Sequence, residues 1–217
     1  MTSSFDTPFD ALPQDIPVFP LPRVVLLPRV ELPLNVFEPR YMAMTTKALS
    51  GARLIGMIQP RNSDDDVPLL YDVGCAGRIV SFSETEDGRY LVTLRGVCRF
   101  KVARELDTDA AGFRRVEPDW SPFRQDMAEE DGTAVCRDAL VETLHRYFDQ
   151  KGMFCDKWEE MYAVSCERLI ATLCVVCPLA TEEKQALLEA PGLEDRAQLL
   201  QSVLERHAGA QDAPQCH

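Results

Sequence analysis

The stretch IPVFPLPRVVLLPRVELPLNVFEPRY, from Ile16 to Tyr41, decides the fold of this chain. Six prolines interrupt its valine, leucine, isoleucine and phenylalanine residues: Pro17, Pro20, Pro22, Pro28, Pro33 and Pro39. Disordered proline-rich tracts are polar, whereas this one is apolar, so it is predicted to be ordered. Proline has no backbone N–H and is excluded from central sheet positions. The stretch therefore predicts short strands that turn, bulge or follow an edge, as in a small, irregular β-barrel.

The residues that follow predict one helix and then more strands. Pro39 suits the first position of a helix, where its missing N–H costs nothing, so a helix is expected over residues 39–50. Apolar and alternating segments then predict strands, with a bulge at Gly96 and a solvated acidic loop at residues 64–66. These strands cover residues 53–59, 73–82, 89–95 and 113–120, and the hairpin signal Asp87-Gly88 precedes the third.

The second half of the chain changes to helical periodicity. Apolar residues at helical spacing predict helices over residues 133–150, 157–176, 181–190 and 193–207. The third of these is expected to begin with Thr181 as its N-cap.

Net charge divides the chain in the same place. Residues 1–116 carry 14 lysines and arginines against 15 acidic residues, whereas residues 117–217 carry 9 against 20. The expected class is therefore α+β: a β-rich unit followed by a helical bundle. The predicted divisions are a flexible leader (1–15), a β-rich subdomain (16–120), a helical subdomain (121–207) and a loose tail (208–217).

Composition and motifs exclude several functions. The sequence has no GxxxxGK[ST], GxSxG or HExxH motif, so no catalytic site, cofactor or metal is predicted. Neither an export signal nor a membrane-spanning run occurs, which favours the cytoplasm. The pair Cys174 and Cys177 forms a CxxC at the end of an apolar helix, where packing is expected in preference to redox or metal chemistry.

Nucleic-acid binding is also not expected. The net charge is −12, and phosphate binding needs clustered lysine and arginine. The basic residues of the 89–105 region are predicted to project outward as a polar strand face: Arg95, Arg99, Lys101 and Arg104.

The opening stretch resembles the signature of the N-terminal substrate-binding domain of Lon (La) ATP-dependent proteases. The residues that carry the resemblance are Pro17 to Leu21, Leu27-Pro28, Pro33-Leu34 and Phe37-Glu38-Pro39-Arg40-Tyr41. Later segments follow in the family's order: Gly56-Met57, Val73-Gly74-Cys75-Ala76, Leu94 to Phe100, and Glu183 to Glu189. The resemblance covers about residues 16–206.

This resemblance implies a PUA-like pseudo-barrel followed by helices, and a role in binding protein segments. Full Lon proteases continue into an ATPase and a Ser-Lys protease, which this sequence does not contain. The resemblance therefore implies a non-enzymatic, stand-alone bacterial protein of the protein quality-control type. Its expected partners are unfolded or exposed segments of other proteins.

Four signature residues are the candidate peptide-binding or fold-signature positions: Phe37, Glu38, Arg40 and Tyr41. In the structural interpretation, the two aromatic rings belong to the core and the two charged residues pair with each other or with charges of the barrel. The alternative function is an adaptor or regulator that docks on a partner protein through the acidic helical half.

Overall fold

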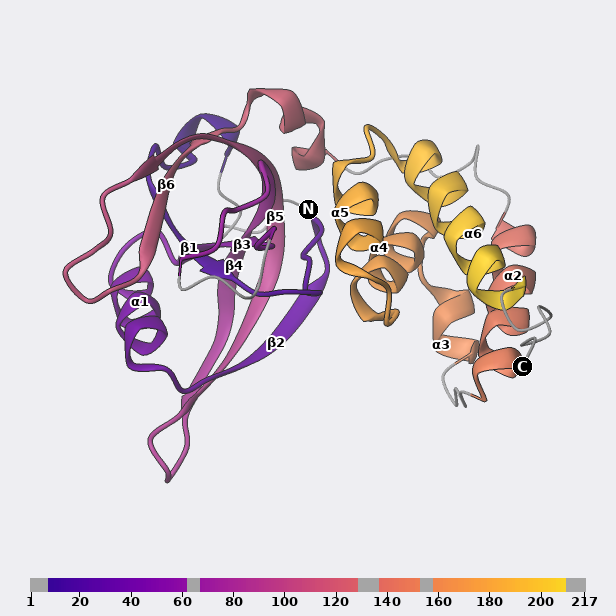
Figure 1. Ribbon diagram of the computed structural model, residues 1–217, viewed down its shortest axis with the longest axis horizontal. Coiled ribbons are helices and arrows are strands. Elements are labelled where there is room, and N and C mark those ends of the chain that lie inside the picture. Colours follow the sequence, from indigo (N-terminus) through magenta and orange to yellow (C-terminus); the bar gives the residue numbers. More distant parts are fainter. Residues whose placement is uncertain (1–7, 62–66, 129–136, 153–157, 210–217) are drawn as a thin grey trace, which may run out of the picture.

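The computed structural model describes residues 8–61, 67–128, 137–152 and 158–209 (Figure 1). The first half of the chain forms a six-stranded sheet with one helix, and the second half forms a group of helices beside it. The strands are β1 (Ile16–Pro20), β2 (Glu31–Val36), β3 (Leu54–Ile58), β4 (Val73–Glu84), β5 (Tyr90–Leu106) and β6 (Arg114–Asp119). The α-helices are α1 (Pro39–Leu49), α2 (Arg137–Lys151), α3 (Trp158–Ala163), α4 (Cys166–Val176), α5 (Thr181–Glu189) and α6 (Leu193–Gly209). Two 3₁₀ helices are η1 (Phe9–Ala11) and η2 (Ser121–Met127).

The predicted α+β class is confirmed. The strands follow the order β2-β5-β4-β3-β1-β6, and β5 also pairs with β6. This extra pairing joins five strands into a ring and leaves β2 outside it. The sheet is therefore partly closed and is not a regular barrel. The predicted acidic loop at residues 64–66 lies outside the described residues, and the predicted domain boundaries stay a prediction.

The three prolines of the opening stretch that lie in strands each have a sheet ladder on one side only. β1 pairs with β3 in parallel and with β6 antiparallel, so it is not an edge strand. However, Pro17 has a partner only in β6, and Pro20 has a partner only in β3. Pro33 lies in β2, which is the expected edge strand because it pairs with β5 alone among the described strands. Each of these three prolines thus has a ladder partner on one side only, where a missing N–H is tolerated.

Gly96 lies at the predicted bulge, and the space around its Cα admits no side chain. The β4–β5 register shifts because Ala76 pairs with Cys98 whereas Gly77 pairs with Gly96. The N–H of Gly96 donates to the Val30 carbonyl at 2.9 Å, and its own carbonyl accepts from Arg29 at 2.8 Å. A Cβ at this position would lie 1.9 Å from the Leu27 carbonyl oxygen. The loop before β2 therefore crosses β5 at a distance that only glycine permits.

We expect Gly96→Ala to lower the free energy of unfolding by about 2–4 kcal/mol, because backbone must move to admit the methyl group. Urea unfolding of the purified protein measures the effect. Gly51→Ala is the matched control, since its Cβ would meet no atom closer than 3.7 Å. Equal stability of the two variants would contradict the close crossing.

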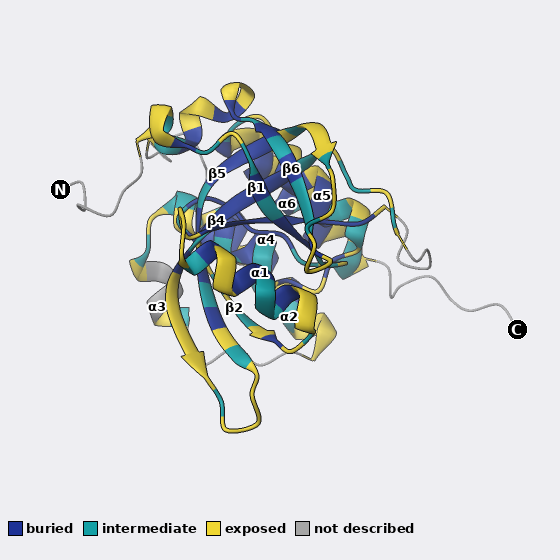
Figure 2. Cartoon of the chain, turned by 90° about the vertical axis from the view of Figure 1, so that its left-hand side faces the viewer, coloured by how far each residue is buried: buried dark blue, intermediate teal, exposed yellow. Residues whose placement is uncertain are grey.

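Two hydrophobic clusters hold the molecule together. The inner cluster fills the ring of strands and includes Ile16, Val18, Phe100 and Val116. The outer cluster begins between α1 and the sheet and continues without a break into α2, α4, α5 and α6. Figure 2 shows buried residues both in the strands and in the helices behind them. No described helix is long and apolar enough to span a membrane.

The helices differ from the prediction at two boundaries. The single helix expected over 157–176 is two helices, because Ser165 adopts an extended backbone (ψ 156°) and caps α4 by accepting from the Arg168 N–H at 3.3 Å. The N-cap of α5 is Ala180 and not Thr181, and the Glu183 carboxylate accepts from the Ala180 N–H at 3.1 Å. Residues 133–136, which the prediction included in a helix, lie outside the described residues.

Arg99 corrects the expectation that the basic residues of β5 project outward. Its side chain is fully buried and forms an ion pair with Asp126 at the end of η2. Nε and Nη2 donate to the two carboxylate oxygens at 2.9 and 2.8 Å. Nη1 donates to the Leu188 and Ala190 carbonyls at 3.0 and 2.6 Å, where α5 ends. The alternation fails here because η2 and α5 cover the face of β5 that the pattern assigned to solvent.

One guanidinium joins β5, η2 and the end of α5, and its removal would leave Asp126 buried without a countercharge. We therefore expect Arg99→Met to lower the free energy of unfolding by about 3–5 kcal/mol. Urea unfolding again measures the loss. Arg104→Met is the control, since Arg104 pairs with Glu117 at the surface and should cost less than about 1 kcal/mol. The double variant Arg99→Met/Asp126→Leu should recover part of the loss. A cost below about 1 kcal/mol for Arg99→Met would contradict this role.

Candidate functional site

A groove opens beside the start of α1. Its volume is about 310 Å³. Four of the residues that line it are prolines: Pro20, Pro22, Pro60 and Pro68. The remaining lining residues are Arg40, Tyr41, Val67, Thr108, Gly112 and Arg114. Val67 is 73% exposed, and the nearby Leu69 is 69% exposed, so apolar side chains stand at the surface of this region. The groove offers rigid apolar walls and a few polar groups, which is the usual composition of a binding site.

The loop wall of the groove is fixed by backbone hydrogen bonds. Pro60 and Leu70 form a bridge at the base of the loop, and the Arg61 N–H donates to the Leu69 carbonyl at 2.7 Å. Arg114 on β6 donates to the Pro68 carbonyl at 2.6 Å and pairs with Glu105 at 2.5 Å. The wall is therefore held at its base and near Val67.

The structure brings together three of the four candidate residues. Tyr41 is buried, with its ring centroid 4.2 Å from that of Phe19, as expected of a core aromatic residue. It also lines the groove together with Arg40. Arg40 lies 4.6 Å over the Tyr41 ring and pairs with Glu38 at 2.9 Å, as the structural interpretation predicted. Burial raises the pKa of the Tyr41 phenol, and the Arg40 charge partly opposes that shift.

Phe37 does not belong to the core, so that expectation is wrong. Its side chain is 62% exposed and lies 6.0 Å from the Arg89 guanidinium. Successive strand residues point to opposite faces, and Val36, the last residue of β2, takes the buried side. Phe37 is consequently directed to solvent, and it is not among the residues that line the groove beside Tyr41.

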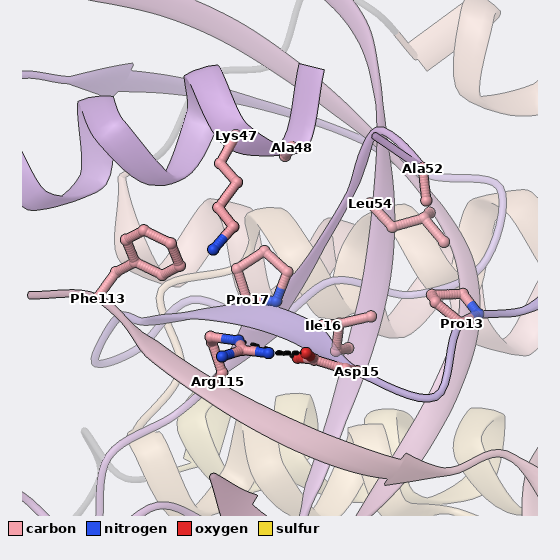
Figure 3. A pocket seen from close by; sticks show the side chains of 10 residues that line it. All are labelled: Pro13, Asp15, Ile16, Pro17, Lys47, Ala48, Ala52, Leu54, Phe113 and Arg115. Carbon is pink, nitrogen blue, oxygen red and sulfur yellow. Dashed lines mark hydrogen bonds and ion pairs between the residues drawn. The ribbon is translucent and has the colours of Figure 1, made fainter. Parts of the chain in front are cut away.

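A second, smaller hollow lies at the other end of α1 (Figure 3). Its volume is about 130 Å³, and Lys47 extends from α1 toward it above the Phe113 ring. Its charged groups are already satisfied, since Asp15 pairs with Arg115 and Lys47 pairs with Asp109. The Lys47 hydrogen bond lowers the pKa of Asp109. The groove beside Tyr41 is the better candidate because it is larger and more apolar.

The cysteines of the CxxC motif are buried among helices. Cys174 and Cys177 are almost fully inaccessible, and burial raises their thiol pKa to about 12 and about 11. Burial also raises the pKa of Cys98 to about 12, and the Asp126 charge adds to that shift. No group of three or more His, Cys, Asp or Glu residues in the described part of the chain could hold a metal ion. Burial and raised pKa together fit a packing role.

We expect these thiols to be unreactive in the native protein. At pH 8 a thiol of pKa about 11 is ionised in only about one molecule in a thousand, and only the thiolate reacts. Iodoacetamide should therefore leave Cys98, Cys174 and Cys177 unmodified at pH 8 and alkylate them after denaturation, as mapped by peptide mass spectrometry. Rapid native alkylation of Cys174 or Cys177 would contradict their burial.

Comparison with known proteins identifies the family. The family model described as the ATP-dependent protease La (LON) substrate-binding domain matches residues 15–206, which is most of the chain. The chain belongs to the Lon substrate-binding domain family. The predicted resemblance is thereby confirmed over nearly the range expected from the sequence.

The relatives are bacterial Lon proteases. The chain is 28% identical to a Lon protease of Parabacteroides distasonis over 200 residues, covering 88% of this chain and 24% of that protein. It is 29% identical to Lon protease 2 of Sorangium cellulosum over 199 residues, with the same two coverages. The chain thus spans about a quarter of the length of these curated relatives.

Solved structures of the family share this fold. A Lon N-terminal domain protein from Xanthomonas campestris superimposes with a TM-score of 0.58 at 24% identity, covering 87% of this chain and 97% of that one. The N-terminal domain of the Mycobacterium avium complex Lon protease gives a TM-score of 0.56 at 15% identity, covering 89% and 99%. At these identities, the likeness establishes the fold and not the binding residues.

Sequence reasoning missed most of the groove. Pro60, Pro68, Thr108 and Arg114 come from three segments that only the closed sheet brings together with α1. Two weak signals were present in the sequence: prolines flank the acidic loop, and the exposed valine and leucine beside it have no helical or strand pattern.

Proposed function

We propose that this protein is a non-catalytic recognition module that binds exposed apolar segments of other proteins in the groove beside Tyr41. The supporting observation is the coincidence of the family's substrate-binding domain with a proline-lined groove at the Glu38-Pro39-Arg40-Tyr41 signature. The volume, about 310 Å³, is at the lower end of the range of roughly 300–1,000 Å³ for ligand sites. It suits one or two side chains of an extended segment.

The prolines explain why such a groove would tolerate many sequences. The four prolines that line the groove present apolar rings and have no backbone N–H. At these positions, no N–H donor therefore has to be matched by an acceptor of the ligand. Their fixed φ also limits the ordering cost on binding. Binding through such walls depends on apolar area, and its affinity is expected to be weak.

Polar groups at the groove would orient the bound backbone. Arg40 and Arg114 both line the groove, but each already has a carboxylate partner, Glu38 and Glu105 respectively. Neutralised guanidiniums keep spare N–H donors for peptide carbonyls without selecting a charged ligand. In this proposal, Phe37 contributes little to binding because it does not line the groove.

The proposal includes the absence of an enzymatic activity, in keeping with a substrate-binding family domain. The alternative, an adaptor that docks through the acidic helical half, has the charge imbalance as its support. It predicts retention of a basic partner that falls steeply with salt. Apolar capture in the groove predicts little dependence on salt.

We expect Val67→Asp to weaken binding of a permanently unfolded, carboxymethylated model protein by about fivefold or more, because a bound apolar segment would desolvate the new carboxylate. Thr108→Trp should weaken binding by a similar factor, because the larger side chain would fill the groove. Both native side chains are exposed, so neither change should affect folding. Fluorescence anisotropy at low and high salt measures the affinity.

Val176→Asp is the matched control, since Val176 is 63% exposed on α4, away from the groove. It should bind as the unmodified protein does. If Val67→Asp and Thr108→Trp retain full affinity while Phe82→Asp on the β4–β5 hairpin loses it, the groove is not the site. Absence of any binding at high micromolar concentration would remove the proposed function itself.

A further inference from the structure

A cavity of about 460 Å³ lies where the sheet meets the helices. The sheet side provides Pro28, Arg29 and Arg95, and the helical side provides the turn at residues 163–165 together with Glu167 and Arg168 at the start of α4. Three arginines and one glutamate thus line one hollow. This excess of positive charge stands out in a chain whose net charge is −12.

Arg29 and Glu167 neutralise each other across the cavity. Arg29 forms an ion pair with Glu167 and also donates to the Asp126 carbonyl at 2.8 Å. Its backbone has a φ of 65°, a left-handed conformation that is uncommon for a residue with a side chain. Arg29 therefore joins the two halves of the molecule. It also offsets the charge of Glu167, the one carboxylate among the described residues that line the cavity.

The positive charges of Arg95 and Arg168 are not offset by an ion pair with any described residue. Both side chains are exposed, and neither has a hydrogen-bond or ion-pair partner among the described residues. Along the sheet, Arg95 lies opposite Glu31 on one side and Arg78 on the other, so its strand neighbours together add no net negative charge. Two guanidiniums, one from each half of the molecule, thus border the same cavity with unused donors.

We propose that this cavity binds a compact oxyanion of the phosphate class between Arg95 and Arg168. Guanidinium groups bind phosphate through paired N–H donors, and they remain charged at every physiological pH. The first turn of α4, which borders the cavity, adds a favourable dipole. The volume admits a diphosphate as readily as a single phosphate group.

A bound oxyanion would connect the sheet to the helices. One ligand would accept hydrogen bonds from β5 and from α4, beside the direct link made by Arg29 and Glu167. Because such a ligand binds the folded protein and not the unfolded chain, its concentration should raise the melting temperature. This site is separate from the groove beside Tyr41, and its existence does not depend on peptide binding.

The test is isothermal titration of the full chain with inorganic phosphate and with pyrophosphate, in a phosphate-free buffer of constant ionic strength. We expect saturable binding, tighter for pyrophosphate, and a melting temperature that rises with either anion. Arg95→Gln and Arg168→Gln should each weaken the affinity by about tenfold. Both residues are exposed and unpaired, so the variants should fold normally.

Arg23→Gln is the matched control. Arg23 is also exposed and has no ion-pair or hydrogen-bond partner in the described part of the chain, but it does not line this cavity. Its variant carries the same loss of charge and should keep the affinity of the unmodified protein within about twofold. No saturable binding, or equal weakening in all three variants, would overturn the proposal, the latter because it indicates a general charge effect.

Discussion

The buried guanidinium of Arg99 is the constraint around which the two halves of the molecule are arranged. Its donors reach the carboxylate at the end of η2 and the carbonyls at the end of α5, so three segments far apart in sequence meet at one side chain. Arg196 donates to the Leu187 and Ala190 carbonyls at 3.0 and 3.2 Å. Two cations thus satisfy the orphan carbonyls at the buried C-terminus of α5, where the helix dipole also favours positive charge.

A second constraint is the closure of the small sheet. A ring of only five strands has little room inside. The fold meets this limit with glycine where backbone segments cross and with proline where a ladder ends. Gly96 admits the loop before β2, and Val18 is the residue of β1 that pairs on both sides. The apolar interior stays small, and the larger outer cluster joins the sheet to the helices.

The sequence predicted what depends on local patterns and failed where distant segments cover a residue. The helix beginning at Pro39, the bulge at Gly96 and the burial of Tyr41 follow from proline geometry, alternation and helical spacing. Arg99 was assigned to solvent because nothing near it in sequence signals that Asp126 and the end of α5 will cover it.

The same limit applies to the candidate site. The signature placed Arg40 and Tyr41 at the groove, since both belong to the α1 start. The opposite wall could not be predicted, because Pro68 and Arg114 approach only when β6 closes the ring. Phe37 was misjudged because one residue decides on which side of β2 a side chain emerges.

The position of the groove has a consequence for assembly. It is formed by the start of α1 and the connection between β5 and β6, at the end of the long axis opposite α2 and α6 (Figure 1). A segment held there would leave the acidic helices uncovered. In the proposed functions, capture in the groove and docking through these helices would therefore use separate surfaces.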